Sequence, residues 1–303
     1  MEKIIVICGP TGIGKTSFSI SLAQRFNGEI VGADSMQIYK HLNIGTAKPT
    51  PNELKKVPHH LVDFVDPRSD FDAGIYVKKA DTAILDIIRR GKIPVVAGGT
   101  GLYIRALLEG LFRSKPACEK TLSKLTRELD EMGKDNLYKK LIQCDPVAAK
   151  KIHPNDSFRV IRALELFQST GNKISEQQKI HNFSDQRYNY LKIGLTMERE
   201  KLYEHINKRV DMMLDEGLLK EVISLVENGY SLDLKSMQSI GYKHMAMFIE
   251  NKVDWPEAVR LFKRDTRRYA KRQFTWFRKD KNIKWFTPSQ INQAQKTVKE
   301  FLT

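Results

Sequence analysis

The 303-residue sequence contains three cysteines and no hydrophobic run long enough to cross a membrane. Cys8, Cys118 and Cys144 are scattered and form no CxxC pair, which excludes a disulfide framework. The first residues lack the basic leader and the small-residue cleavage site of a signal peptide. No apolar run approaches the roughly 20 residues that a transmembrane helix requires. We therefore expect a cytoplasmic protein that does not associate with membranes.

Acidic residues are also scarce relative to basic ones. The chain has 36 Asp and Glu against 51 Lys and Arg, a formal net charge of +15, and its isoelectric point is about 9.6. Surplus positive charge suits a polyanionic partner, although a diffusely basic surface that only aids solubility is the alternative. The position of the charges along the chain has to decide between a polyanionic partner and a diffusely basic surface.

The first third of the sequence alternates short apolar runs with helical patterns. Apolar residues recur at helical spacing in residues 16–26 and 75–90. The apolar runs that we expect to form strands are 3–8, 29–33, 60–64, 93–98 and, much later, 191–196. Strands separated by helices predict an α/β fold with a parallel sheet.

The sequence between 114 and 187 is different, because it is polar and mostly helical in pattern. We interpret it as an all-helical insertion carried by the sheet domain. The core then comprises 1–113 and 188–303, and its second part ends in a basic helix over 257–279.

A phosphate-binding loop lies between the first expected strand and the first expected helix. Residues 9–16 are GPTGIGKT, which matches G-x-x-x-x-G-K-[ST] in full. The glycines allow backbone amides to turn toward anionic oxygens, Lys15 adds a positive charge, and the Thr16 hydroxyl is a candidate Mg²⁺ ligand. The candidate phosphate-binding residues are Gly9, Pro10, Thr11, Gly12, Ile13, Gly14, Lys15 and Thr16.

This loop does not by itself identify the phosphorylated substrate, since most such loops hold ATP or GTP. The strand at 93–98 ends in Gly98-Gly99-Thr100, where many nucleotide-binding proteins have a carboxylate. Asp34, at the end of the second expected strand, is the nearest well-placed carboxylate. It faces the ligand crevice if the sheet is parallel, and a helix cap is the alternative role.

Several longer blocks occur in order along almost the whole chain, and together they resemble the tRNA dimethylallyltransferase (tRNA isopentenyltransferase) family. The blocks are GPTGIGKT (9–16), ADSMQIYKHLNIGTAKP (33–49), PHHLVDFVDP (58–67), FDAGIY (71–76), GGTGLYIRAL (98–107), NDSFRVIRALE (155–165), SIGYK (239–243) and TRRYAKRQFTWFR (266–278). This resemblance implies a P-loop NTPase-like core. It also implies transfer of the dimethylallyl group from dimethylallyl diphosphate to N6 of the adenosine just 3′ of the anticodon, with release of diphosphate.

The resemblance also implies roles for individual residues. The phosphate-binding loop would hold the diphosphate together with Mg²⁺, Asp34 would be the general base, and Thr100 would belong to the catalytic site. The residues implied to contact the tRNA anticodon arm are Asp34, Ser35, Met36, Gln37, Thr100, Phe158, Arg159, Val160, Ile161 and Arg162. Contact of Arg159 or Arg162 with the diphosphate is an open alternative.

The basic helix at 257–279 is amphipathic, and its charge is nearly all of one sign. Between Lys263 and Lys281 nine basic residues stand against two acidic ones. A solvated helix face usually alternates in sign, so this pattern favours contact with the tRNA backbone through residues such as Arg267, Arg268 and Lys271.

The sequence departs from the eukaryotic relatives in one respect, because it has no Cys/His ligand set for their C-terminal zinc finger. It is therefore typical of the bacterial form, and we expect a zinc-free monomer. Two rival functions share the phosphate-binding loop. A nucleotide or nucleoside kinase leaves the basic helix unexplained, and an RNA-binding ATPase leaves the ADSMQIY and GGTGLY blocks without a function.

Overall fold

The computed structural model describes residues 2–111, 118–181 and 186–303. The chain divides into two compact units. The first combines Met1–Leu108 with Arg187–Thr303, and the second is Glu109–Gln186. The second unit begins five residues before the insertion that we expected at 114–187 and ends one residue before its end. No helix in the described part of the chain has the length and apolar character needed to traverse a bilayer.

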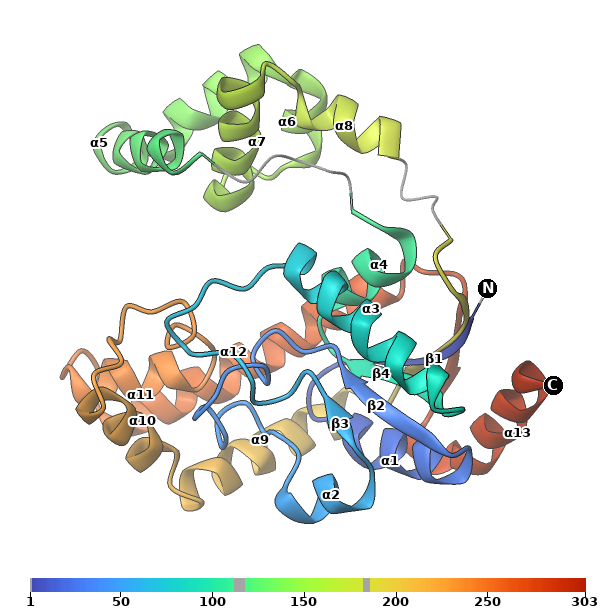
Figure 1. Cartoon of the computed structure of the whole chain (residues 1–303). Helices are drawn as coiled ribbons and strands as arrows, with labels where there is room; N and C mark the ends of the chain where they lie inside the picture. Colours follow the sequence, from blue (N-terminus) through green and yellow to red (C-terminus); the bar gives the residue numbers. More distant parts are fainter. Residues whose placement is uncertain (1, 112–117, 182–185) are drawn as a thin grey trace. The chain divides into compact units, whose positions relative to one another are not determined.

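The first unit is built on one parallel sheet (Figure 1). In the described residues its six strands follow the order β3-β2-β4-β1-β5-β6. They are β1 Lys3–Cys8, β2 Gly28–Gly32, β3 His59–His60, β4 Ile93–Gly98, β5 Asn189–Leu195 and β6 Ile283–Phe286. The expected α/β fold with a parallel sheet is confirmed.

One expectation about the strands was wrong, and one strand was not predicted. The strand expected at 60–64 is only the pair His59–His60, because Leu61 (φ 60°) and Asp63 (φ 57°) adopt left-handed backbone and turn the chain away from β2. The short strand β6 was not expected, and it pairs with β5 at the edge of the sheet.

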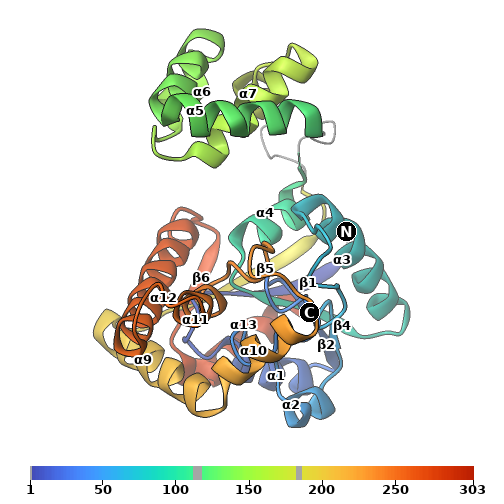
Figure 2. The same cartoon turned by 90° about the vertical axis from the view of Figure 1, so that its left-hand side faces the viewer.

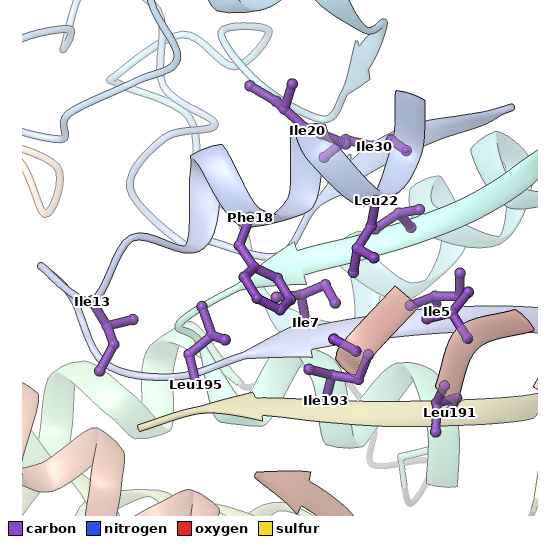
Figure 3. Close-up of a cluster of buried hydrophobic side chains, with 14 of the residues drawn as sticks. Ile5, Ile7, Ile13, Phe18, Ile20, Leu22, Ile30, Leu191, Ile193 and Leu195 are labelled. Atoms are coloured by element: carbon purple, nitrogen blue, oxygen red, sulfur yellow. The ribbon is translucent and has the colours of Figure 1, made fainter. Parts of the chain in front are cut away.

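Helices cover both faces of the sheet, and the alternation of side chains along β1 explains why. Ile5 and Ile7 point to the face covered by α1 (Lys15–Arg25), where they pack in a buried cluster with Phe18 and Leu22 (Figure 3). Ile291–Leu302 (α13) covers the same face.

The other face of the sheet carries Ile4, Val6 and Cys8, which pack against α3 (Ala73–Arg89) and α4 (Gly101–Glu109). Helix α3 begins where the Asp72 carboxylate accepts the backbone N–H of Ile75 at 2.8 Å. The short helix α2 (Pro51–Lys56) has a capping box formed by Thr50 and Glu53.

Four more helices pack together at one side of the sheet (Figure 2). They are α9 Arg199–Asp215, α10 Leu218–Glu227, α11 Tyr242–Ile249 and α12 Trp255–Phe277. Their shared core includes Phe262, Tyr242 and Val210, and it also takes up Ile38 from the segment after β2. A 3₁₀ turn at Pro288–Gln290 leads into α13. The helix expected over 257–279 corresponds to α12.

The second unit is all helical in its described residues. It consists of α5 Glu119–Cys144, α6 Pro146–Lys151, α7 Ser157–Thr170 and α8 Ile174–His181. Helix α5 kinks at Gly133, whose φ of 76° is outside the helical region. Leu137, Leu141, Val160 and Leu164 belong to a separate core that holds these helices together.

Candidate active site

The carboxyl ends of the parallel strands meet at one edge of the sheet, and three of the sequence blocks follow them there. The phosphate-binding loop follows β1, Asp34 follows β2 by two residues, and Thr100 follows β4 by two residues. Ligands of open α/β sheets bind at this edge, at the point where the strand order reverses. Here β1 lies between β4 and β5, so the loop stands at that point.

The phosphate-binding loop makes a tight turn and then opens the helix α1. Gly12 (φ 78°) and Gly14 (φ 94°) adopt conformations that side chains rarely tolerate. A Cβ on Gly12 would lie 2.9 Å from Cγ1 of Ile206 in α9, so the loop also packs closely on that helix. Free backbone N–H groups at a helix N-terminus favour an anion in the turn.

Lys15 is held inside this turn. Its Nζ donates a hydrogen bond to the carbonyl of Pro10 at 2.8 Å. Burial lowers the pKa of Lys15 to about 8, whereas the negative charge of Asp34 opposes that shift. An arriving diphosphate supplies the negative charge that the buried ammonium lacks.

A second cation extends into the same cavity from α9, and no sequence motif predicts it. Arg209 lines a cavity of about 100 Å³ together with Lys15, Thr16 and Asp34. Burial lowers the pKa of Arg209, and Asp34 again opposes the shift. Arg209 follows the phosphate-binding loop by almost two hundred residues and belongs to no local motif, so only the fold reveals its position.

Asp34 acts as a cap for its own loop and also faces the ligand cavities. Its Oδ1 accepts the backbone N–H groups of Met36 at 2.9 Å and Gln37 at 3.4 Å. The carboxylate also lines both the small cavity and a larger neighbouring one. Asp34 thus faces the ligand cavities and caps a turn, whereas no helix begins after it, because residues 35–38 form turns.

Thr100 fixes the loop that carries Asp34. Its Oγ1 accepts the backbone N–H of Ser35 at 2.9 Å and donates to Ser35 Oγ at 3.3 Å. Its own backbone N–H donates to the carbonyl of Ala33 at 3.1 Å. The fold thus joins two blocks that are more than sixty residues apart in the sequence.

Gln37, expected to contact tRNA, uses its side-chain amide within the protein. Its Nε2 donates to the carbonyls of Thr46 at 3.2 Å and Ala47 at 2.9 Å. It therefore anchors the segment after β2, and it also lines the small cavity. Ser35 and Met36 face the larger cavity.

The larger cavity has a volume of about 310 Å³ and lies beside the small one. Its walls are mixed: one part is apolar or aromatic, and the rest is polar. The apolar and aromatic lining comprises Met36, Ile206, Val210, Met213, Ile240, Phe262 and Tyr269. The polar lining includes Thr11, Asp34, Ser35, Arg209, Ser239 and Arg272. A cavity of this kind suits an apolar group or a planar base with a few polar atoms.

The FRVIR block lies in α7 of the second unit, and its side chains differ in exposure. Phe158 is 83% exposed, and the Arg159 side chain, paired with Asp156, is 64% exposed. Val160 is 1% exposed in the helical core, which argues against an RNA contact through its side chain. Arg162 pairs with Glu165, and Ile161 packs on the core.

The basic residues of α12 also differ from one another. Arg267 is half-buried and donates to Asn207 Oδ1 at 2.6 Å, whereas Arg268 and Lys271 are exposed. Trp276 is 38% exposed at the end of the helix.

The residues at the small cavity fit a bound Mg²⁺. Magnesium prefers oxygen ligands and binds through one or two protein oxygens, substrate phosphates and water. The Thr16 hydroxyl supplies such an oxygen in this cavity, with Lys15 and Arg209 beside it for the phosphates.

The parallel sheet and the phosphate-binding loop define a P-loop α/β protein. Comparison with known proteins identifies the family within this class. The family model described as IPP transferase matches residues 37–280. The tRNA dimethylallyltransferase of Desulfosudis oleivorans is 48% identical over 301 residues, which cover 99% of this chain and 96% of that protein. The chain belongs to the tRNA dimethylallyltransferase (IPP transferase) family.

Solved structures agree with this assignment. The tRNA isopentenylpyrophosphate transferase of Bacillus halodurans is 41% identical, with a TM-score of 0.75 over 100% of this chain and 97% of that one. A eukaryotic dimethylallyltransferase, solved while acting on tRNA, is 33% identical with a TM-score of 0.82. That match covers 98% of this chain and 78% of the eukaryotic one.

Proposed function

We propose that this protein transfers the dimethylallyl group of dimethylallyl diphosphate to N6 of the adenosine 3′-adjacent to the anticodon in tRNA, releasing diphosphate. The observation that carries the proposal is the position of Asp34. Its carboxylate borders both the cavity of the phosphate-binding loop and the larger mixed cavity. A base in that position lies where a phosphorylated donor and a second substrate meet. The family membership described above supports the same reaction.

The reaction needs a base because the N6 lone pair of adenine is delocalised into the ring. Asp34 accepts the N6 proton as the N6–C1 bond forms, and the bond between C1 and the diphosphate oxygen breaks. The electron pair of that bond leaves with the diphosphate. Thr100 holds Ser35, and so keeps the Asp34 loop in place during the transfer.

The leaving diphosphate gains negative charge as the bond breaks, and cations around the small cavity stabilise it. Lys15, Arg209 and the amides at the start of α1 perform this task. Mg²⁺ held at the Thr16 hydroxyl would supply further positive charge on the phosphate oxygens.

The acceptor adenine is normally stacked in the anticodon loop, so it must leave the stack to reach Asp34. Flipping a base costs a few kcal/mol and requires a pocket to receive it. The cavity of about 310 Å³ beside Asp34 offers aromatic and polar walls for that purpose. Because its substrate is tRNA, we place the reaction in the cytoplasm.

Two exposed surfaces suit the RNA backbone. One is the basic face of α12 with Arg268 and Lys271, and the other is the start of α7 with Phe158 and Arg159. Cations on such surfaces bind phosphates, and an exposed aromatic ring stacks on an unpaired base. We assign both to the anticodon arm.

The test separates prenyl transfer from kinase or ATPase chemistry. The protein is incubated with Mg²⁺, an unmodified anticodon stem-loop with adenosine at the target position, and either dimethylallyl diphosphate or ATP. We expect the RNA to gain the mass of one dimethylallyl group with the first donor only. Phosphate transfer or release from ATP, with no change in RNA mass under either donor, would refute the proposal.

A further inference from the structure

Gln273 of α12 is a polar side chain in an unusual place. It is only 6% exposed, and the other buried residues of α12 are the apolar Ala258, Phe262, Ala270 and Phe277. Burying an amide costs free energy unless its donor and acceptor atoms are both satisfied. The hydrogen bonds of this side chain therefore show which parts of the protein it connects.

The amide of Gln273 bridges two parts of the active site. Its Oε1 accepts the backbone N–H of Thr11, within the phosphate-binding loop, at 2.9 Å. Its Nε2 donates to the carbonyl of Gly99, in the turn after β4, also at 2.9 Å. Tyr269, one turn earlier on α12, lies close to both Thr100 and Gln273 and lines the larger cavity.

These bonds form a continuous connection between the phosphate-binding loop and the loop that carries Asp34. From Thr11 the connection passes through Gln273 to Gly99 and its neighbour Thr100. Thr100 then holds Ser35, the residue next to Asp34. The fit is close, because a Cβ on Gly99 would lie 2.4 Å from Nε2 of Gln273.

We propose that Gln273 is a positioning residue that keeps the phosphate-binding loop and the Asp34 loop in a fixed position relative to each other. This inference rests on the proposed prenyl transfer, for which C1 of the donor and N6 of the acceptor must meet at a defined distance. A misplacement of about 1 Å costs roughly a hundredfold in rate, while the separate binding sites survive. Gln273 thus acts through the two loops and does not touch either substrate.

The first experiment compares Gln273→Leu and Gln273→Glu with the wild-type protein. Leu removes both polar atoms, whereas a Glu carboxylate keeps the acceptor for Thr11 and loses the donor for Gly99. We expect both variants to lower the single-turnover rate of prenyl transfer by about tenfold to a hundredfold. Dissociation constants for magnesium pyrophosphate and for the anticodon stem-loop should stay within about threefold of wild type.

Gln293→Leu is the matched control, because Gln293 lies on the exposed side of α13. It should leave the rate unchanged. An unchanged rate in Gln273→Leu, or losses of both affinities as large as the loss of rate, would overturn the positioning role.

Gly99 provides a second route to the same contact. Gly99→Ala should push the Gln273 amide aside and lower the rate as Gln273→Ala does. The double variant should then be little slower than Gln273→Ala alone, because both changes break one connection. If the rate losses of the two single variants multiplied in the double variant, the two residues would act independently, and this result would contradict the proposal.

A measurement without turnover separates this inference from the proposed function. Hydrogen exchange of the Thr11 amide should be slow in the wild-type protein and clearly faster in Gln273→Leu, since that N–H loses its acceptor. Unchanged protection of Thr11 would overturn the positioning role even if prenyl transfer is established. Faster exchange in the variant, together with a wild-type protein that transfers no prenyl group, would instead defeat only the proposed function.

Discussion

The side chain of Thr100 is hydrogen-bonded to Ser35, with 2.9 Å between Thr100 Oγ1 and the Ser35 backbone nitrogen. This bond ties the turn after β4 to the loop after β2, and it thereby fixes the residue beside Asp34. The position of Asp34, the proposed general base, consequently depends on the hydroxyl of Thr100, which is distant in the sequence.

Replacing Thr100 with Val should therefore slow the reaction. Valine keeps the shape but leaves the Ser35 N–H without its acceptor, at a cost of about 1–3 kcal/mol. We expect the single-turnover rate to fall by roughly tenfold or more, and Thr100→Ser to retain most of it. Thr82→Val, at an exposed hydroxyl of α3, is the control. Equal rates for Thr100→Val and wild type would show that the bond is dispensable.

The lowered pKa of Lys15 predicts a pH dependence of diphosphate binding. With a pKa of about 8 in the free protein, Lys15 is mostly charged below pH 8 and loses its charge as the pH rises further. Bound diphosphate favours the charged form, so affinity for magnesium pyrophosphate should fall as the pH rises above about 8. Calorimetric titration from about pH 6.5 to about pH 9.5 measures this effect.

Lys15→Gln provides the comparison for this titration. Its affinity should be weaker throughout and should change much less across the same pH range, because the titrating group is gone. An equally steep decline in the variant would assign the pH dependence to another group.

Arg209→Gln tests the cation that local sequence patterns do not reveal. Removal of a charge-assisted hydrogen bond worth about 1.4 kcal/mol or more should raise the dissociation constant of magnesium pyrophosphate by roughly tenfold. The neighbouring Lys208 is exposed and outside both cavities, so Lys208→Gln should have little effect. Similar affinities for the two variants would remove Arg209 from the diphosphate site.

The exposed basic face of α12 should contribute to the salt dependence of RNA binding. Neutralising Arg268 and Lys271 to Gln should weaken binding of the anticodon stem-loop and leave pyrophosphate affinity unchanged. The slope of log K against log salt should flatten by roughly 0.7–0.9 for each RNA phosphate that the protein no longer neutralises. The double change of Lys296 and Lys299 to Gln on exposed positions of α13 is the charge-matched control. An equal slope in the α12 variant and wild type would place the RNA elsewhere.

Much of the fold is predictable because the relevant signals are local. The strand β1, the phosphate-binding loop and α1 follow one another within 23 residues, and each has its own pattern. Strand β6 is only four residues long, too short for its pattern to stand out. The expected strand at 60–64 failed because left-handed backbone at Leu61 and Asp63 outweighed apolar composition.

The site is only partly predictable for a related reason. Asp34 and Thr100 stand directly after strands, so a parallel sheet brings them to one edge. Arg209 and Gln273 reach that edge from helices whose placement depends on tertiary packing. Composition alone labels them as ordinary polar residues of amphipathic helices.

The most direct test of the proposed mechanism is the rate of prenyl transfer by Asp34→Asn under single-turnover conditions. Asparagine keeps the size of the side chain and retains an oxygen for the Met36 N–H, but it cannot take a proton from N6. With dimethylallyl diphosphate, Mg²⁺ and the adenosine-containing stem-loop, we predict a rate about 10²- to 10⁴-fold below wild type, with little change in either substrate's affinity. Asp70→Asn, at an exposed carboxylate, should react at the wild-type rate. Transfer by Asp34→Asn at the wild-type rate would contradict the central claim that Asp34 is the base.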